Sequence, residues 1–323
     1  MLEAVVSRHL DFDEAHELFT CLLDESEVRM AAYLAAMQAK GYGGAELAGL
    51  AMAMREHALR VDLGMTCDTC GTGGDRACTI NVSTAVALML SCHARVAKHG
   101  NSSITSQSGS SDVLSALGIN VVAAPDTVHD GMDACSFSYL HAPLYHPALQ
   151  RIMPVRRMLG IRTVFNILGP LANPASPRYQ LIGVSDRDLL PIVAEALCHM
   201  DVTRALVVHG DGLDEAHPCS TTTLLEVCGD EVSASTITPK ECGIRSAPIL
   251  PVSSPEESAR RIEAVLRGDG ICEDRVLLTL NGALALHVAT GRDYDECADI
   301  ARETLMGDAY RQLKVIRNAY PKA

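Results

Sequence analysis

Tryptophan is absent from the 323 residues, and aromatic residues make up only 4% of them. Positive charge is also scarce, because 27 Lys and Arg stand against 40 Asp and Glu and leave a formal net charge of −13. A surface that binds nucleic acid or anionic lipid needs clustered Lys and Arg. The composition therefore disfavours both kinds of partner, although it does not exclude a small basic pocket.

Long apolar runs are missing as well. No stretch approaches the roughly 18 uninterrupted apolar residues of a membrane span, and the N-terminus lacks an apolar core, so we expect no signal peptide and no membrane segment. The 12 cysteines are irregularly spaced, which favours reduced thiols and a cytoplasmic protein. Cys67 and Cys70 form a CxxC pair without a second CxxC or a nearby His pair. We interpret them as small half-buried residues before a loop rather than as a metal or redox site.

Hydrophobic residues make up 48% of the chain, which is enough for a large buried core. The first sixty or so residues follow helical spacing. Asp11 and Glu14 form a capping box before one helical pattern, and others run over about 27–40 and 47–61. These short helices predict a small bundle that packs against a larger domain.

From about Cys67 onward, short apolar runs alternate with helical stretches and Gly-containing turns. Helices are expected over 83–93, 110–117, 186–199 and 256–266, and strands over 94–97, 119–124, 179–184, 205–210, 223–227 and 276–280. This alternation predicts an α/β domain with a largely parallel, buried sheet. A hairpin expected around Gly229 and Asp230 makes the sheet mixed.

Three glycines lie within the four residues 71–74, and Asp75 follows them. Such a loop lets backbone N–H groups approach a ligand, and a helix start near Ser83 adds partial positive charge. The sequence Asn81-Val82-Ser83-Thr84 adds small polar side chains, with Ser83 expected as the helix cap. A tight turn is the alternative for the glycines alone, and the loop matches neither Walker A nor the dinucleotide fingerprint. We predict that it binds phosphate.

A second polar loop follows the strand expected at 94–97. It reads Lys98-His99-Gly100-Asn101 and continues as a serine-rich run over 102–111. In open α/β sheets, ligands usually bind at the carboxyl ends of strands. A turn that only caps the next helix is the alternative, but two such loops on successive connections favour a ligand site.

Two further features bear charge. Asp214 and Glu215 are adjacent in a Gly-containing turn, and such a pair suits Mg²⁺, which prefers one or two carboxylates plus substrate phosphate oxygens, unless it is only a solvated turn. The segment 146–174 places arginines near Pro and Gly turns, at positions 156, 157 and 162. Arginine either clamps a ligand carboxylate or forms surface salt bridges.

In this order, the motifs resemble those of the anthranilate phosphoribosyltransferase family. They extend over most of the chain and are GTGGD (71–75), NVST (81–84), KHGN (98–101), SGSSDVLSALG (108–118), HPA (146–148), PVRRMLGIRTVFNILGPLANP (154–174), GLDE (212–215) and NGALAL (281–286). The resemblance implies transfer of the ribosyl phosphate of phosphoribosyl pyrophosphate (PRPP) to the amine of anthranilate, with release of pyrophosphate, in tryptophan biosynthesis. It also implies a helical domain over 1–64, joined by about 155–178, and an α/β domain with a central mixed sheet over 65–154 and 179–323. The family is usually a homodimer that contacts through the helical domains.

The resemblance assigns roles to particular residues. PRPP would be held by Gly71, Gly74, Asp75, Thr79, Asn81, Val82, Ser83, Thr84, Lys98, His99, Gly100, Asn101, Ser102, Ser103, Ile104, Thr105, Ser106 and Ser110. Two Mg²⁺ ions would be positioned by Ser83, Asp214 and Glu215, and anthranilate would be bound by Gly71, Asn101 and Arg156, with His99 and His146 as further candidates. Lys98, Asn101 and Arg156 are the implied catalytic residues. An aromatic amine is neutral at pH 7, so catalysis can rest on proximity and on stabilising the leaving pyrophosphate.

Some positions depart from the family pattern. Arg76 stands where glycine often follows GTGGD, while Ser102 and Gln107 replace a common Arg and a common Lys. Two basic side chains near the phosphates are thus missing, and Arg76 could compensate for one of them. The sequence Ala216-His217-Pro218 after the carboxylate pair is also unusual.

The sequence disfavours two alternative functions. A pyrimidine nucleoside phosphorylase shares the architecture, but KHGN together with FNILGPLANP and two PRPP-type loops disfavours it. A nucleic-acid-binding relative without transferase activity would need a basic surface and would have lost the anthranilate positions. The charge of −13 and the presence of Asn101 and Arg156 disfavour that reading.

Overall fold

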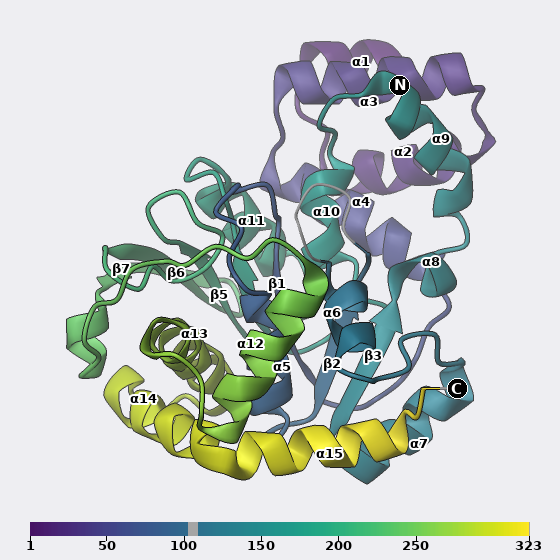
Figure 1. Cartoon of the computed structure of the whole chain (residues 1–323). Coiled ribbons are helices and arrows are strands. Elements are labelled where there is room, and N and C mark those ends of the chain that lie inside the picture. Colours follow the sequence, from purple (N-terminus) through teal and green to yellow (C-terminus); the bar gives the residue numbers. More distant parts are fainter. Residues whose placement is uncertain (103–108, 323) are drawn as a thin grey trace.

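The structure is a computed structural model that describes residues 1–102 and 109–322. Four helices open the chain: α1 (Leu2–Ser7), α2 (Phe12–Asp24), α3 (Glu27–Lys40) and α4 (Gly44–Glu56). The capping box before α2 is confirmed, because the Glu14 N–H donates to Asp11 Oδ1 at 2.9 Å and the Asp11 N–H donates to Glu14 Oε2 at 3.1 Å. These helices form the purple layer at the top of Figure 1.

A seven-stranded sheet follows, in the order β3-β2-β1-β4-β5-β6-β7. Its strands are β1 (Cys67–Gly71), β2 (Val96–Gly100), β3 (Phe137–His141), β4 (Tyr179–Gly183), β5 (Arg204–His209), β6 (Thr222–Cys228) and β7 (Glu231–Ile237). Strands β1 to β5 pair in parallel, whereas β5–β6 and β6–β7 pair antiparallel. The turn between β6 and β7 holds Gly229 at φ +61°, so the expected hairpin and the mixed sheet are confirmed.

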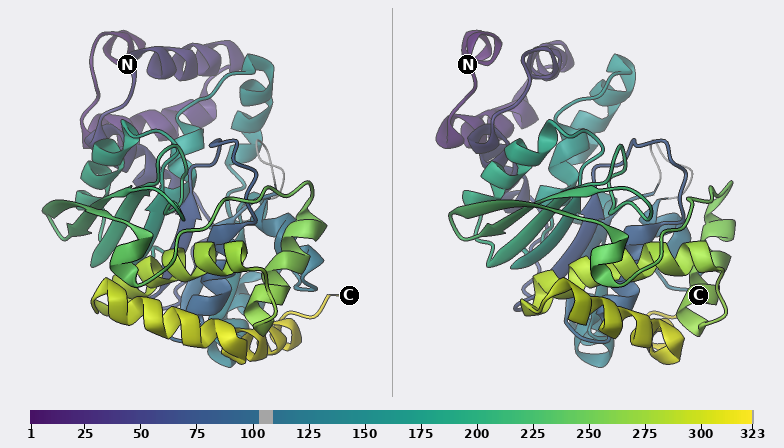
Figure 2. Two further views of the ribbon diagram at one scale, coloured as in Figure 1. Left: turned by 60° about the vertical axis from the view of Figure 1, so that its left-hand side comes forward. Right: turned by 90° about the vertical axis from the view of Figure 1, so that its left-hand side faces the viewer.

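Helices cover both faces of this sheet, as Figure 2 shows in its right-hand view. One face packs on α5 (Val82–Leu90) and α13 (Cys272–Thr290) and includes Leu181 and Leu206; we call this cluster the α13 core. The other face packs on α4 and α11 (Leu189–Cys198) and includes Ile182 and Val207; we call it the α4 core. Successive strand residues alternate between the two cores, as the pleat of a strand requires.

The remaining helices complete the two layers. They are α6 (Ser110–Ala116), α7 (Pro125–Cys135), α8 (Ala142–Tyr145), α9 (Leu149–Leu159), α10 (Phe165–Leu171), α12 (Pro255–Arg267), α14 (Tyr294–Glu303) and α15 (Ala309–Ala319), with a 3₁₀ turn at Pro239–Cys242 and a π-helical turn at Thr304–Asp308. Helices α9 and α10 return to the N-terminal layer, where Ile152 and Phe165 join the α4 core. Figure 1 shows them in teal beside the purple helices.

The fold class is confirmed as an N-terminal helical domain plus a larger α/β domain with a mixed, mostly parallel sheet. The boundaries at residue 64 and at about 155–178 stay a prediction. Among the described residues, no helix is both long enough and apolar enough to cross a membrane.

Two strand predictions were wrong. The run 276–280 lies inside α13, where each of its residues is at least 92% buried, and a helix buried on all sides shows no polar stripe that would distinguish it from a buried strand. The run 119–124 is a loop before α7, in which Ile119 makes an isolated bridge with Pro321. Strands β1 and β3 were not among the predictions.

The CxxC pair lies within β1. Cys67 is buried in the α13 core, whereas Cys70 packs against the α4 core, so the two thiols leave the strand on opposite faces. All 12 cysteines are free. The interpretation of this pair as packing residues fits these positions.

Candidate active site

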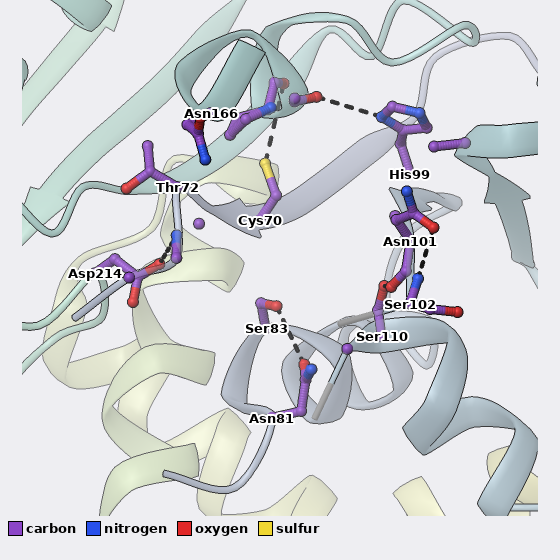
Figure 3. Close-up of a pocket in the computed structure, with 18 of the residues that line it drawn as sticks. Cys70, Thr72, Asn81, Ser83, His99, Asn101, Ser102, Ser110, Asn166 and Asp214 are labelled. Carbon is purple, nitrogen blue, oxygen red and sulfur yellow. Dashed lines mark hydrogen bonds between the residues drawn. The ribbon is translucent and has the colours of Figure 1, made fainter. Parts of the chain in front are cut away.

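A cavity of about 340 Å³ opens at the carboxyl ends of β1 and β2, beneath α9 and α10. Figure 3 shows polar side chains from several loops that face it from all sides. The structure brings together here the predicted residues Gly71, Gly74, Asp75, Thr79, Asn81, Val82, Ser83, Lys98, His99, Gly100, Asn101, Ser102, Ser110, Arg156, Asp214 and Glu215. Thr84 does not line the cavity, because it is fully buried inside α5. Ser103, Ile104, Thr105, Ser106 and Gln107 lie outside the described residues.

The glycine loop after β1 is folded tightly against its neighbours. Gly73 and Gly74 have φ of +67° and +84°, a region that glycine adopts without strain. The Thr72 N–H donates to Gly183 O at 2.9 Å, and Ser185 Oγ donates to Gly73 O at the same distance. The Gly73 N–H donates to Asp214 Oδ2 at 2.6 Å. These hydrogen bonds hold the loop in shape.

Helix α5 begins at the floor of the cavity. Asn81, rather than the expected Ser83, is its N-cap, and Asn81 Oδ1 accepts the Thr84 N–H at 3.1 Å. Ser83 Oγ also donates to Asn81 Oδ1, at 3.4 Å (Figure 3). Because Asn81 caps the helix, the Ser83 hydroxyl can still turn to a cation or a ligand.

The carboxylate pair follows β5. Asp214 contacts the glycine loop through the Gly73 N–H, and Glu215 contacts the start of α5 through the Ser83 N–H. Burial, followed by the charge of Asp75, raises the pKa of Asp214 to about 7. Burial and the charge of Asp214 raise the pKa of Glu215 well above its usual value, while the Ser83 N–H opposes that rise. Confined carboxylates that repel one another favour a cation between them.

The donor chemistry fits Mg²⁺, because the candidate ligands at positions 83, 214 and 215 are all hard oxygens. Within residues 1–102 and 109–322, no group of three or more His, Cys, Asp or Glu side chains makes a complete metal site. The pair therefore suits a cation that takes its other oxygens from water and from a bound phosphate.

Lys98 of β2 is nearly fully buried, at 1% exposure, and it lines the cavity. Its Nζ donates to Thr69 O at 2.7 Å and to Ser83 Oγ at 3.3 Å. Burial lowers its pKa, and the negative charge of Asp68 opposes that shift. The side chain reaches the cavity as a fixed charge at its base.

The second loop supplies Asn101 and Ser110. Ser110 Oγ donates to Asn101 O at 3.3 Å, and Asn101 Oδ1 accepts the Ser102 N–H at 2.7 Å. These bonds hold residue 101 at the rim of the cavity, opposite Asp214 and Thr72 (Figure 3).

A histidine pair lies above that loop. His99 donates from Nδ1 to Gly169 O at 3.3 Å, and the Nε2 atoms of His99 and His146 are 3.2 Å apart. Burial lowers the pKa of His99 well below its usual value and that of His146 to about 4. Both rings are therefore neutral at pH 7. His99 lines the cavity, whereas His146 supports it from behind.

Arg156 of α9 lines the opposite wall. Its guanidinium lies over the Phe165 ring, 5.3 Å from the ring centroid, and Nη1 is 3.4 Å from Met153 Sδ. No carboxylate of the described chain forms an ion pair with it. A half-buried arginine without an acidic partner suits a ligand carboxylate.

Sequence reasoning assigned no role to several other residues that line the cavity. They include Met54, Cys70, Cys78, Met153, Phe165 and Asn166, whereas Thr72 and Gly73 belong to the loop predicted to bind phosphate. Phe165 and Asn166 lie in the quoted segment 154–174, which was a usable signal, whereas Met54 comes from α4 and carried none. Arg76 is exposed and does not line the cavity, but Arg162 Nη2 donates to Gly73 O at 3.4 Å.

Comparisons with known proteins agree with this geometry. Residues 3–58 match the model of the glycosyl transferase family, helical bundle domain, and residues 63–310 match that family's a/b domain. An anthranilate phosphoribosyltransferase of Pyrococcus furiosus is 51% identical over 98% of both chains. The crystal structure of the Thermus thermophilus enzyme of that name superposes with a TM-score of 0.91 at 36% identity, over 98% of both chains.

The enzyme of that name from Saccharomyces cerevisiae, solved in complex with PRPP and Mg, gives a TM-score of 0.86 at 26% identity, over 96% of this chain and 93% of that one. The same yeast enzyme has also been solved with 4-fluoroanthranilate, at a TM-score of 0.84, 25% identity and the same coverage. From both matched family models and the identity over nearly its whole length, the chain belongs to the anthranilate phosphoribosyltransferase family.

Proposed function

We propose that the protein transfers the phosphoribosyl group of PRPP to the amine of anthranilate, giving N-(5-phosphoribosyl)anthranilate and pyrophosphate. The observation that carries this proposal is one cavity with two chemically different ends. Backbone N–H groups, Ser83, Lys98 and the carboxylate pair gather at one end, and Arg156 stands at the other. Such a cavity suits a phosphorylated donor and an aromatic carboxylate acceptor at the same time.

At the phosphate end, the glycine loop, the start of α5 and the loop after β2 would hold the phosphates of PRPP through N–H groups and hydroxyls. Ser83, Asp214 and Glu215 would hold Mg²⁺, and we propose two ions. When bound, Mg²⁺ would neutralise charge on the leaving pyrophosphate. Lys98 contributes a fixed positive charge to the same end, although its Nζ is already bonded to Thr69 and Ser83.

At the acceptor end, Arg156 would bind the carboxylate of anthranilate, and Asn101 and Gly71 would contact the ring from the facing loops. The stack of Arg156 on Phe165 keeps the guanidinium in place before the ligand arrives. Because both histidines are neutral at pH 7, neither ring places a positive charge beside the aromatic amine. The catalytic contribution of these residues is to hold the amine close to the ribose carbon.

The direct test is to incubate the protein with PRPP, Mg²⁺ and anthranilate and to follow the loss of anthranilate fluorescence. Turnover that needs all three components supports the proposal. Phosphorolysis of uridine without turnover of anthranilate would favour a pyrimidine nucleoside phosphorylase. Absence of turnover with anthranilate and with other aromatic amines would falsify the proposed reaction.

We also propose a homodimer that contacts through the helical domain. Exposed apolar side chains on this layer support it: Val6 of α1 is 62% exposed, Val28 of α3 is 80% exposed and Met158 of α9 is 66% exposed. Light scattering coupled to gel filtration should give twice the mass of the chain. The Val28→Glu variant should shift the protein toward the monomer, whereas a wild-type monomer would contradict the proposal.

A further inference from the structure

The turn that carries the two carboxylates is enclosed by three strand ends. A Cβ atom on Gly71, at the end of β1, would lie 2.2 Å from Asp214 Oδ2. A Cβ on Gly183, at the end of β4, would lie 1.5 Å from Asp214 O. A Cβ on Gly210, just after β5, would lie 2.2 Å from Glu215 O. Only glycine at these positions lets the turn come so close to the sheet.

The fourth side of this enclosure is Asn281, in the middle of α13. Its side chain is fully buried, and it bonds both polar groups of the residue that follows the carboxylates. Asn281 Oδ1 accepts the Ala216 N–H at 2.7 Å, and Nδ2 donates to Ala216 O at 3.2 Å. A third bond, from Nδ2 to Leu277 O at 2.9 Å, anchors the amide to its own helix.

These bonds fix the direction of the main chain directly after Glu215. Asn281, Glu215 and Ser83 also line one small cavity, so the amide stands beside two of the proposed Mg²⁺ ligands. Residues that orient ligands from behind typically contribute about 10- to 100-fold to metal affinity. The alternative is a purely structural role, in which the amide only satisfies the hydrogen bonds of buried backbone groups and contributes to the stability of the fold.

We propose that Asn281 is a positioning residue that sets the placement of Asp214 and Glu215 toward Mg²⁺ and the pyrophosphate group of the substrate. The inference rests on the proposed function, since it concerns the same site. It assigns to α13, which provides no wall of the main cavity among the described residues, an indirect part in binding the metal–pyrophosphate unit, through the main chain of Ala216.

The test uses Asn281→Ala, with Leu280→Ala as the matched control. Leu280 is the neighbouring residue on α13 and is fully buried in the α13 core, so its truncation destabilises the same helix but leaves the hydrogen bonds between Asn281 and Ala216 in place. Binding of Mg²⁺ with pyrophosphate is measured by calorimetry at low temperature, where circular dichroism shows each variant to be folded. Turnover gives the Michaelis constants for PRPP and for anthranilate.

Asn281→Ala should weaken binding of Mg²⁺–pyrophosphate by about 10- to 100-fold and raise the Michaelis constant for PRPP, with that for anthranilate nearly unchanged. Leu280→Ala should bind Mg²⁺–pyrophosphate like the wild type. Equal binding by Asn281→Ala and the wild type, or equal weakening in both variants, overturns the inference.

If Asn281→Ala does not fold, Asn281→Ser replaces it, because the shorter hydroxyl keeps a polar group at this position but cannot bond both the N–H and the carbonyl of Ala216. It should weaken Mg²⁺–pyrophosphate binding in the same way, and wild-type binding in this variant overturns the inference. The calorimetry also separates the two proposals. A wild-type protein that binds Mg²⁺–pyrophosphate but does not convert anthranilate would contradict the proposed reaction and leave the role of Asn281 to be tested by binding.

Discussion

The Gly73 N–H points at Asp214 Oδ2, 2.6 Å away. The amide belongs to the loop that the sequence assigns to phosphate, and the acceptor is a carboxylate that it assigns to Mg²⁺. The two motifs are 141 residues apart in the chain, yet each fixes the other. A ligand that carries both a cation and a phosphate can satisfy both partners when it replaces this bond.

The first prediction concerns Asp214→Asn. The amide keeps an oxygen for the Gly73 N–H but loses the charge, so kcat/KM for PRPP should fall by about 100-fold or more. The folded-state pKa of Asp214 is raised to about 7, so the folded protein keeps this carboxyl protonated at pH values where the unfolded chain has lost the proton. The stability that this proton contributes is lost as the pH rises through about 7.

Without ligand, Asp214→Asn should therefore be more stable than the wild type above pH 7, by about 1–3 kcal/mol. Urea unfolding at pH 8 measures this difference, and steady-state kinetics measure the loss of activity. A variant that is less stable and fully active would contradict both parts.

The second prediction is that Arg156→Ala raises the Michaelis constant for anthranilate far more than that for PRPP. Loss of a charge-assisted bond to a carboxylate corresponds to an increase of about 10- to 100-fold. Arg157→Ala is the control, because Arg157 is exposed on the same helix and does not line the cavity. Equal effects of Arg156→Ala on both substrates would remove Arg156 from the carboxylate-binding role.

The third prediction concerns Arg162→Gln. Arg162 Nη2 donates to Gly73 O at 3.4 Å, and a Cβ on Gly74 would collide with this guanidinium. Neither Arg162 nor Arg76 lines the cavity, but Arg162 contacts the glycine loop directly. The substitution should raise the Michaelis constant for PRPP by about fivefold, since an exposed charge is screened by solvent.

Arg187→Gln, an exposed arginine shortly after β4, should have no such effect. Raising the ionic strength should weaken PRPP binding more in the wild type than in Arg162→Gln. The same salt dependence in both proteins would show that this charge does not act on the substrate.

The fourth prediction is a pH effect of the buried histidine His146. Its pKa is lowered by burial to about 4, whereas an unfolded histidine titrates near about 6.5. The unfolded state therefore binds more protons below about pH 6.5, and stability is lost as the pH falls toward 4. Between pH 7.5 and pH 5 the loss amounts to about 2 kcal/mol.

His146→Gln should remove this share of the dependence, whereas His99, whose pKa burial also lowers, keeps its own share in both proteins. The raised pKa of Asp214 acts with the opposite sign, but it is present in both proteins and cancels in the difference. Urea unfolding of both proteins at pH 7.5 and pH 5 gives the comparison. Parallel losses in the wild type and the variant would contradict the assignment.

The sequence predicted the parts of the fold that have an amphipathic pattern. Helix α3 has the expected bounds, and the hairpin around Gly229 was marked by its turn residues. Strand β1 was missed because its interior is polar: Asp68 and Thr69 are both 1% exposed. Asn173 donates to Asp68 at 2.8 Å, and Thr69 donates to Ser83 O at the same distance. Partners so far apart in the chain leave no local pattern.

The site was predicted as far as its motifs reach. Loops with unusual glycine or serine content identified the phosphate end, because glycine lets the backbone approach a ligand and N–H groups at a helix start bind anions. Met54 and Asn281 could not be assigned roles in the same way. Their importance depends on which helix faces meet, and that is decided by tertiary packing rather than by local sequence.

The cavity has walls from two separate hydrophobic cores. Phe165 belongs to the α4 core and stands on one side, whereas Ile80 and Val82 belong to the α13 core and stand on the other. A molecule that spans the cavity would act as a reversible crosslink between them. Pyrophosphate alone, which fills only one end of the cavity, would stabilise one core. The two substrates together would make the two cores unfold as a single cooperative unit.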